Sequence, residues 1–241
     1  LGTQLNAEPA PFTLELVDTH GGEFSSITVN KLGYARISYY TGSGTGGFLR
    51  YAERRCEGWS AMVIDPDFLQ GGYTSIALNA AGEPRISYRD GANDNLKYAE
   101  RTAGDWNRYY VDGADGFDAG AYTSLALDAN GQPRISHYDA DFNNLKYSER
   151  IGGAWFNYYV DGFDGVNAGT YTSLALDTAG NPHISYYDET HGNLKHAVRS
   201  GGNWNFEVVD GPPGVSVGAF TSIKLFGNAP RISYRDETNG D

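Results

Sequence analysis

The sequence has one cysteine, Cys56, and one methionine among its 241 residues. A single cysteine excludes an internal disulfide, so packing and hydrogen bonds must hold the fold together. We interpret Cys56 as incidental, with pairing between two molecules as the alternative. No apolar run is long enough to span a bilayer.

Basic residues are also scarce, with 18 Lys and Arg against 30 Asp and Glu, a net charge of −12 and a pI near 4.7. This balance disfavours nucleic acid and anionic membranes as partners. Few lysines, abundant Tyr, Gly and Asn, and an N-terminus at Leu1 that looks processed and carries no signal peptide predict an exported protein. We expect an extracellular, cell-surface or periplasmic location.

Helical periodicity is missing as well, because no stretch repeats its apolar residues every 3.6 positions for long enough. What is present is a phrase close to Tyr-Thr-Ser-Leu-Ala-Leu-Asp. Its copies begin at Phe24, Tyr73, Tyr122, Tyr171 and Phe220, always 49 residues apart. A period of this length is typical of repeat folds such as β-propellers.

Each repeat predicts four short strands, A to D, joined as an antiparallel meander. In the third copy they are 122–128, 134–139, 144–150 and 155–161, rich in β-branched and aromatic residues and bounded by Gly, Pro, Asn or Asp. Strand A carries large residues such as Leu125 on one face and small ones such as Ser124 on the other. Both faces are therefore expected to be buried, which favours radially stacked sheets over a two-sheet sandwich.

The sequence thus predicts an all-β, five-bladed β-propeller with four antiparallel strands per blade, in one domain covering residues 1–241. Complete blades are expected at 24–65, 73–112, 122–161 and 171–210. The last would combine 220–241 with 1–18, because Phe12 to Asp18 matches a strand D and Leu1 to Ala7 a degenerate strand C. Both termini would then close the ring.

Loop lengths separate the two rims of the predicted ring. The A–B and C–D turns are almost constant, whereas the D–A and B–C loops vary from repeat to repeat. Because binding residues tend to lie on variable loops of a rigid scaffold, we expect the D–A and B–C rim to be the working surface. The first blade, with its long loop from Thr41 to Gly47, is the one most unlike the others.

Acidic and aromatic residues gather at this rim. The candidate ligand-binding carboxylates end strand B at Asp90, Asp139, Asp188 and Asp236, and strand D at Asp112, Asp161 and Asp210. They have two interpretations: oxygen ligands for Ca²⁺, or caps of Asx turns, which we favour. The nearest match to a calcium loop, Asp139-Ala-Asp141-Phe-Asn143, lacks the Gly and Glu that such a loop needs. Any metal thus stays unknown, with Ca²⁺ possible, and no other cofactor is expected.

The tryptophans Trp59, Trp106, Trp155 and Trp204 all open strand D and are expected to be packing anchors. Tyr40 and Tyr187, in strand B beside the working rim, are better candidates for stacking on sugar rings. His137 and His183 replace residues of the sister repeats and are expected to be isolated, without a catalytic or ligand role.

In blade number, length and regularity the chain resembles the five-bladed lectins of the tachylectin-2 type, and its repeat phrase is similar to repeats of exported bacterial propeller proteins. The resemblance implies a lectin-like binding module and carries no site residue across. We expect no catalysis and a carbohydrate or a protein as partner. The alternative is a five-bladed glycoside hydrolase, which requires two unlike carboxylates. No catalytic residue is assigned, because the repeats offer no unique acidic residue on the innermost strand.

Overall fold

The computed structural model describes residues 13–42, 47–67 and 69–240. This part of the chain is all-β, as predicted, and forms five antiparallel sheets in chain order. The first holds β1 (Glu23–Val29), β2 (Ala35–Tyr40), β3 (Leu49–Arg55) and β4 (Gly58–Asp65). The second holds β5 (Gln70–Leu78), β6 (Pro84–Asp90), β7 (Asn95–Thr102) and β8 (Asp105–Asp112).

The third sheet holds β9 (Ala119–Leu127), β10 (Pro133–Asp139), β11 (Asn144–Ile151) and β12 (Ala154–Asp161). The fourth holds β13 (Ala168–Leu176), β14 (Pro182–Asp188), β15 (Asn193–Ser200) and β16 (Asn203–Asp210). The fifth has two strands, β17 (Val217–Phe226) and β18 (Ala229–Asp236). The predicted A-to-D meander is therefore confirmed in the first four sheets, which we call the first to fourth blades.

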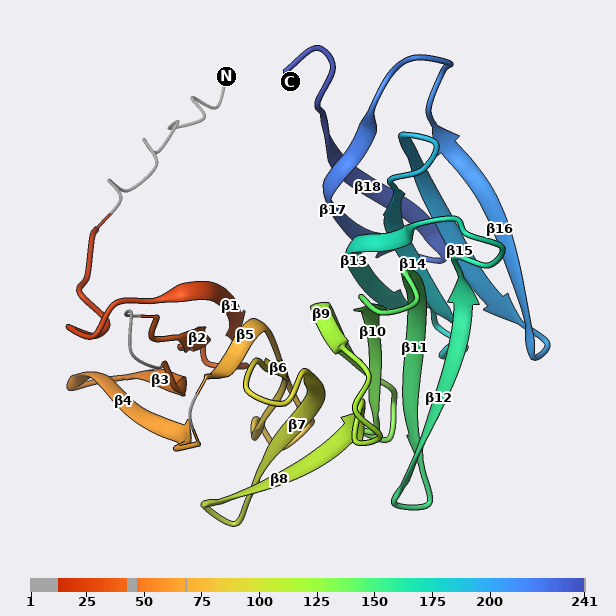
Figure 1. The fold of residues 1–241 in the computed structure, drawn as a ribbon. Helices are drawn as coiled ribbons and strands as arrows, with labels where there is room; N and C mark the ends of the chain where they lie inside the picture. The colour runs from red at the N-terminus through yellow and green to blue at the C-terminus, as the bar shows by residue number, and fades with distance from the viewer. Residues whose placement is uncertain (1–12, 43–46, 68, 241) are drawn as a thin grey trace, which may run out of the picture.

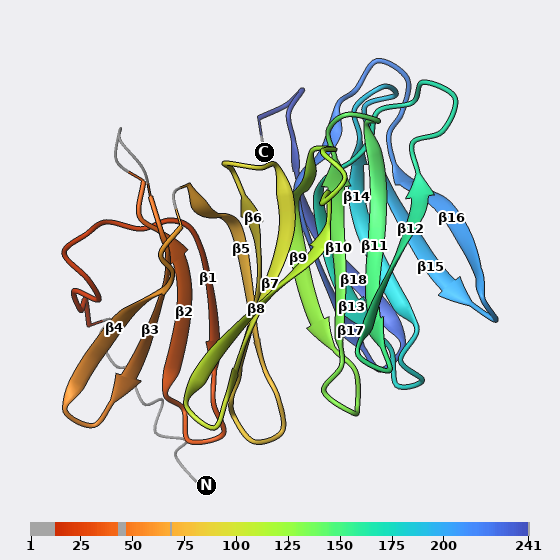
Figure 2. The ribbon, with the colours of Figure 1, turned by 60° about the horizontal axis from the view of Figure 1, so that its bottom comes forward.

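The sheets stand face to face around an axis (Figures 1 and 2). Strand A of each repeat is innermost, so β1, β5, β9, β13 and β17 contact one another in that order. Between the first two blades, Leu49, Tyr51 and Ile64 pack against Ile76 and Ile86. Large residues thus fill each interface, and this is the stacking that the alternation in strand A predicts.

The aromatic residue that opens each repeat adopts a left-handed backbone, with φ between 50° and 54° at Phe24, Tyr73, Tyr122, Tyr171 and Phe220. Such a conformation is costly for an aromatic residue and accompanies an irregular register in the inner strand. Gly120, two residues before Tyr122, has φ +96°, and a Cβ atom on it would lie 2.9 Å from the Cα of Leu96 in the preceding blade. The inner strand therefore needs glycine to approach the preceding blade.

Closure of the ring remains a prediction. Within the described residues, β17 and β18 have no third strand, and residues 13–18 form no strand with them. Phe12 and the proposed strand at Leu1 to Ala7 lie outside the described residues. Asp18 nevertheless contacts Tyr39 and Arg50 of the first blade. The aspartates that end strand D in the complete blades contact the blade that follows them in the same way, as Asp65 does with Tyr88. No helix in the described chain is suited to cross a membrane.

Candidate functional site

The acidic residues that end strand D join each blade to the next. Asp65 is fully buried; its Oδ2 accepts a hydrogen bond from the Tyr88 hydroxyl at 2.7 Å and contacts Lys97 Nζ at 2.6 Å. Its Oδ1 contacts Arg108 at 2.9 Å. Burial alone would raise the pKa of Asp65, but the hydrogen bonds from Lys97 and Tyr88 hold it below its ordinary value.

The other predicted aspartates that end strand D make the same kind of contact with the following blade. Asp161 binds Tyr186 and Lys195, Asp112 binds Lys146, and Asp210 accepts from the exposed Tyr234. Asp112, Asp161 and Asp210 are thus brought to the predicted rim, each engaged with the following blade. Their first role is to align blades, and a ligand would meet them only beside the lysine or tyrosine that they already bind.

The residues that end strand B accept hydrogen bonds from backbone amides of the B–C turns, and Asp90 forms the predicted Asx turn, with the amide two residues on. The Asp90 Oδ1 accepts from the amide of Ala92 at 3.0 Å. A second bond, from the amide three residues on, runs to Asp90 from Asn93, to Asp139 from Phe142, to Asp188 from His191 and to Asp236 from Asn239. Asp90, Asp139 and Asp188 are buried, so a ligand has little access to them, whereas Asp236 is partly exposed.

Tyr187 is also engaged inside the protein, because its hydroxyl lies 2.6 Å from Ser216 Oγ in the D–A loop. Tyr138 binds Asn167 in the same way at 2.9 Å, so these residues clamp the D–A loop to the preceding blade. Tyr40 is half-buried at the equivalent position of the first blade. The predicted tyrosines therefore reach the rim, but two of these three hydroxyls position loops.

The predicted calcium loop uses its oxygens internally. Besides the Asp139 cap, the Oδ2 of Asp141 accepts from the Asp118 amide at 2.8 Å. Among the residues that the structure describes, no three His, Cys, Asp or Glu side chains converge in a way that would hold a metal ion.

The two histidines singled out from the sequence are not isolated. His183 Nδ1 lies 3.1 Å from His196 Nε2, and Glu207 lies 2.8 Å from the other nitrogen of His196. His137 Nε2 is 3.1 Å from Ser148 Oγ and 3.6 Å from Asp112 Oδ2. Both distances involve the same nitrogen, and His137 and Ser148 are fully buried, so this is no nucleophile–base–acid relay.

An exposed aromatic group lies on the predicted rim between the second and third blades. Phe117 from the D–A loop is 5.1 Å from Phe142 of the B–C loop, and Phe142 is 6.4 Å from Tyr159 on β12, measured between ring centres. Each ring is 41 to 47% exposed, and Lys146 Nζ lies 4.8 Å from the Tyr159 ring. We call Phe117, Phe142 and Tyr159 the rim aromatic cluster.

Polar groups adjoin this cluster. The Arg89 guanidinium contacts both carboxylate oxygens of Asp118 at 2.9 Å and also binds Asp94. Asp118 follows Phe117 directly, and Asp141 precedes Phe142. Phe117, Phe142, Tyr159 and Arg89 are not among the site residues predicted from the sequence. An available signal was that Phe142 is the single aromatic residue in the B–C loops of the three middle blades.

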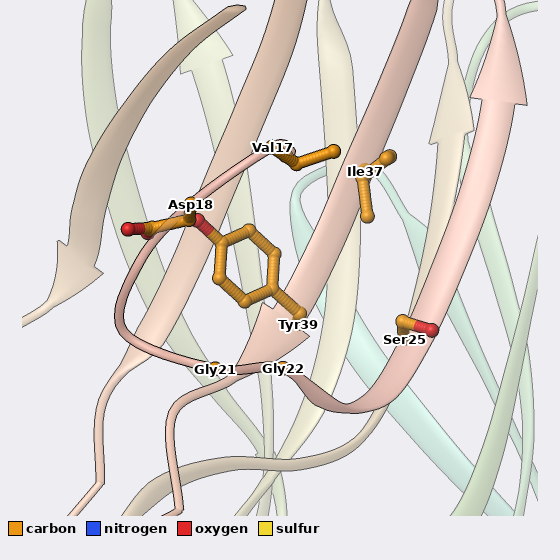
Figure 3. Close-up of a pocket in the computed structure, with 7 residues that line it drawn as sticks. All are labelled: Val17, Asp18, Gly21, Gly22, Ser25, Ile37 and Tyr39. Atoms are coloured by element: carbon orange, nitrogen blue, oxygen red, sulfur yellow. The ribbon is translucent and has the colours of Figure 1, made fainter. Parts of the chain in front are cut away.

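Other hollows lie away from this rim. Three clefts of about 320 to 480 Å³ lie between neighbouring A–B turns, and the largest is lined by Arg85, Glu100 and Arg150. A further pocket of about 320 Å³ opens on the face of the first blade that is turned away from the second blade. There Ile37 and Tyr39 face Val17 and Asp18 (Figure 3). A closed ring would place a blade over this last pocket.

No protein-family model matches the sequence, and no curated protein matches it significantly. Solved structures do resemble the fold. AofleA from Arthrobotrys oligospora has a TM-score of 0.59 at 13% identity, over 87% of this chain and 63% of that one. The fucose-specific lectin from Aleuria aurantia has a TM-score of 0.53 at 15% identity, over 79% and 62%.

An exo-β-1,3-galactanase from Phanerochaete chrysosporium, solved with galactose, has a TM-score of 0.55 at 11% identity, over 93% of this chain and 64% of that one. The chain therefore spans less than two thirds of the length of these three structures. At such identities the likeness shows the fold alone, and that fold is a β-propeller.

Proposed function

We propose that the chain is a non-catalytic carbohydrate-binding module whose ligand site is the rim aromatic cluster. The observation that carries the proposal is that Phe117, Phe142 and Tyr159 keep 41 to 47% of their surface exposed while contacting one another on three separate elements. The likeness to a fucose-specific lectin supports the same function.

The chemistry of the cluster suits a sugar ring. An aromatic face packs well against the C–H side of a pyranose, and bound polar groups at the edge fix its orientation. Asp118 and Arg89 already form a paired carboxylate and guanidinium beside Phe117. The hydroxyls of a bound sugar would hydrogen-bond to this carboxylate and guanidinium, and each charge would keep its existing partner.

The repeats do not supply this cluster equally. The fourth blade has Thr190 and His191 where the third has Asp141 and Phe142, and the second has Ala92 and Asn93. We therefore propose one principal sugar site, between the second and third blades.

A glycan array followed by isothermal titration tests this proposal. Phe142→Ala is expected to weaken binding about tenfold or more, which corresponds to about 1.4 kcal/mol. Phe156→Ala is the matched control, since Phe156 is 45% exposed and sits near the other end of β12. Equal losses in both variants, or binding unaffected by Phe142→Ala, would reject the site.

A glycoside hydrolase is the second candidate. Lys146 lies between Asp112 and Asp139, and burial raises the pKa of Asp139 although the Phe142 amide and Lys146 oppose that shift. Two carboxyls in unlike surroundings are what such enzymes need, and galactanases are among the similar structures. Turnover of a galactan by the wild type, abolished by Asp139→Asn, would favour this candidate over the binding module.

A protein partner on the same rim is the remaining alternative. The aromatic cluster suits a protein interface as well, because aromatic residues and arginine are enriched there. A negative glycan array, together with a protein ligand whose affinity depends on Phe142, would select it.

A further inference from the structure

The stack of blades ends in two sheet faces that are uncovered in the described structure. We define the N-face by Ser25 and Ile27 of β1, on the side turned away from β5. Ile27 is 66% exposed, whereas the equivalent residues Ile76, Leu125, Leu174 and Ile223 are 1 to 8% exposed. The C-face is defined by Ser222 and Lys224 of β17 and Ser233 of β18, all exposed on the side turned away from β13.

All four joints between neighbouring blades use one set of inner contacts. A serine of the inner strand accepts from the next inner strand, as Ser124 Oγ does from the Leu174 amide at 3.0 Å. The same bond measures 3.0 to 3.2 Å at the other three joints. A serine of strand B also pairs with a hydroxyl of the next blade, as Ser136 does with Thr172 at 2.8 Å.

The aromatic residues that open the repeats complete the set. Their ring centres follow one another at 4.7, 4.8, 4.8 and 4.4 Å from Phe24 to Phe220. Phe24 and Phe220 end this ladder, at 47% and 60% exposure.

The two end faces therefore hold the two halves of one joint. By position, Ser222 matches the serines that accept the bond between inner strands, and the Ile27 amide matches its donors. Ser233 and Ser25 match the two hydroxyls of the second bond. Phe220 stands where it would continue the ladder onto Phe24. The same bonds already form four times in the chain, so the fit of the halves follows from the repeat.

We propose that the C-face of one molecule docks on the N-face of a second copy of this chain. The contact is head to tail, because the two faces differ, and such contacts build rings or open chains of molecules.

The arrangement of the described residues favours a second copy over the same molecule. Figure 1 shows the inner strands along an open arc, with β1–β2 and β17–β18 at its two ends. The curvature of that arc is set by four joints of nearly equal contact distances. In this arrangement the N-face and the C-face do not meet within one molecule (Figure 1).

The N-face is also prepared to receive two strands. Residues 13–18 already lie where a preceding blade would place its outermost strand, with Glu15 on Arg54 and Trp59 and Asp18 on Tyr39. Among the described residues, no inner strands of a preceding blade pack on the N-face, and the C-face belongs to the two-stranded sheet β17–β18.

Lys224 offers a sensitive probe of the contact. The second, third and fourth blades have Ala77, Ala126 and Ala175 at this position, and Ala77 and Ala126 pack against the core of the next blade. A lysine there must place its ammonium group at the edge of the joint, so it weakens the contact relative to alanine.

Sedimentation velocity of the 241-residue chain over a wide range of concentrations tests the proposal. We expect the wild type to assemble as concentration rises, Ile27→Asp to assemble at least about tenfold more weakly, and Lys224→Ala to assemble more tightly. Because Ile27 is exposed in the single molecule, Ile27→Asp should keep the wild-type melting temperature at low concentration.

A wild type that stays monomeric at every concentration would overturn the proposal. If Ile27→Asp also lowered the melting temperature of that monomer, the two faces would close within one chain. Assembly that persists in Ile27→Asp would assign it to another surface and overturn the proposal as well. Glycan binding is measured separately with Phe142→Ala, so failure of this contact and failure of the sugar site are distinguishable.

Discussion

Replacing Asp65 with alanine tests the claim that buried carboxylates hold the blades together. Lys97, only 5% exposed, would lose its 2.6 Å partner, and Tyr88 would lose its acceptor. Removing one member of a buried pair costs about 3–5 kcal/mol, because the remaining charge is stranded. Asp67 and Asp90 lie 3.9 Å from Lys97 and compensate in part, so we expect about 3 kcal/mol.

Asp210→Ala is the matched control for Asp65→Ala. Asp210 ends strand D in the same way, but its partner Tyr234 is 38% exposed and has no Lys97 equivalent among the described residues. We expect a loss of about 1 kcal/mol there. Thermal unfolding followed by circular dichroism should then show a decrease of about 6–12 °C for Asp65→Ala and of about 2–4 °C for Asp210→Ala.

The pH dependence gives a second check. The pKa of Asp65 is lowered in the folded protein, so its stabilising contribution is complete above the unfolded value of about 3.9 and is lost as pH falls through the folded value. The difference between wild type and Asp65→Ala should be constant from pH 7 to about pH 5 and shrink in stronger acid. Equal costs for Asp65→Ala and Asp210→Ala, or a difference that grows in acid, would refute the reasoning.

Two further outcomes follow from burial. Burial lowers the pKa of His137 to about 4. As the pH falls, the unfolded chain therefore takes up this proton before the folded protein does, and stability declines between about pH 6.5 and pH 4. His137→Phe should remove about 3 kcal/mol of that decline, measured by unfolding at a series of acid pH values. A slope unchanged in the variant would contradict this. Ile76→Ala should cost about 2–5 kcal/mol and Ile27→Ala under about 1 kcal/mol, measured by urea unfolding at low protein concentration, and similar costs would mean that both isoleucines are buried.

The repeat made the fold readable from the sequence. Alternation in strand A predicted sheets buried on both faces, and Leu125 and Ile135 do lie in the core. Three of the four tryptophans are confirmed as packing anchors, since Trp106 contacts Tyr51, Trp155 contacts Tyr98 and Trp204 contacts Tyr147 across the joints. Each repeat restates the same pattern, so local propensity and packing agree in all four of the four-stranded blades.

The candidate site was harder to predict because its residues depart from the repeat. Phe117 and Phe142 lie in two loops that the sequence separates by a strand pair, and their meeting depends on how the D–A loop is clamped. The acidic residues were predicted as possible ligands because they recur. Recurrence instead reflects the joint that every blade needs, as Asp161 on Lys195 shows. Closure of the ring by the two termini of one chain depends on long-range geometry and stays a prediction, with the docking of two copies as its competitor.

A crystal structure of the chain with the tightest ligand from the glycan array would test the central claim most directly. The account predicts a sugar ring stacked on Phe142, with hydroxyls bonded to the pair formed by Asp118 and Arg89. A sugar seated in the clefts between the A–B turns, beside Arg85 and Glu100, with the rim aromatic cluster vacant, would contradict it.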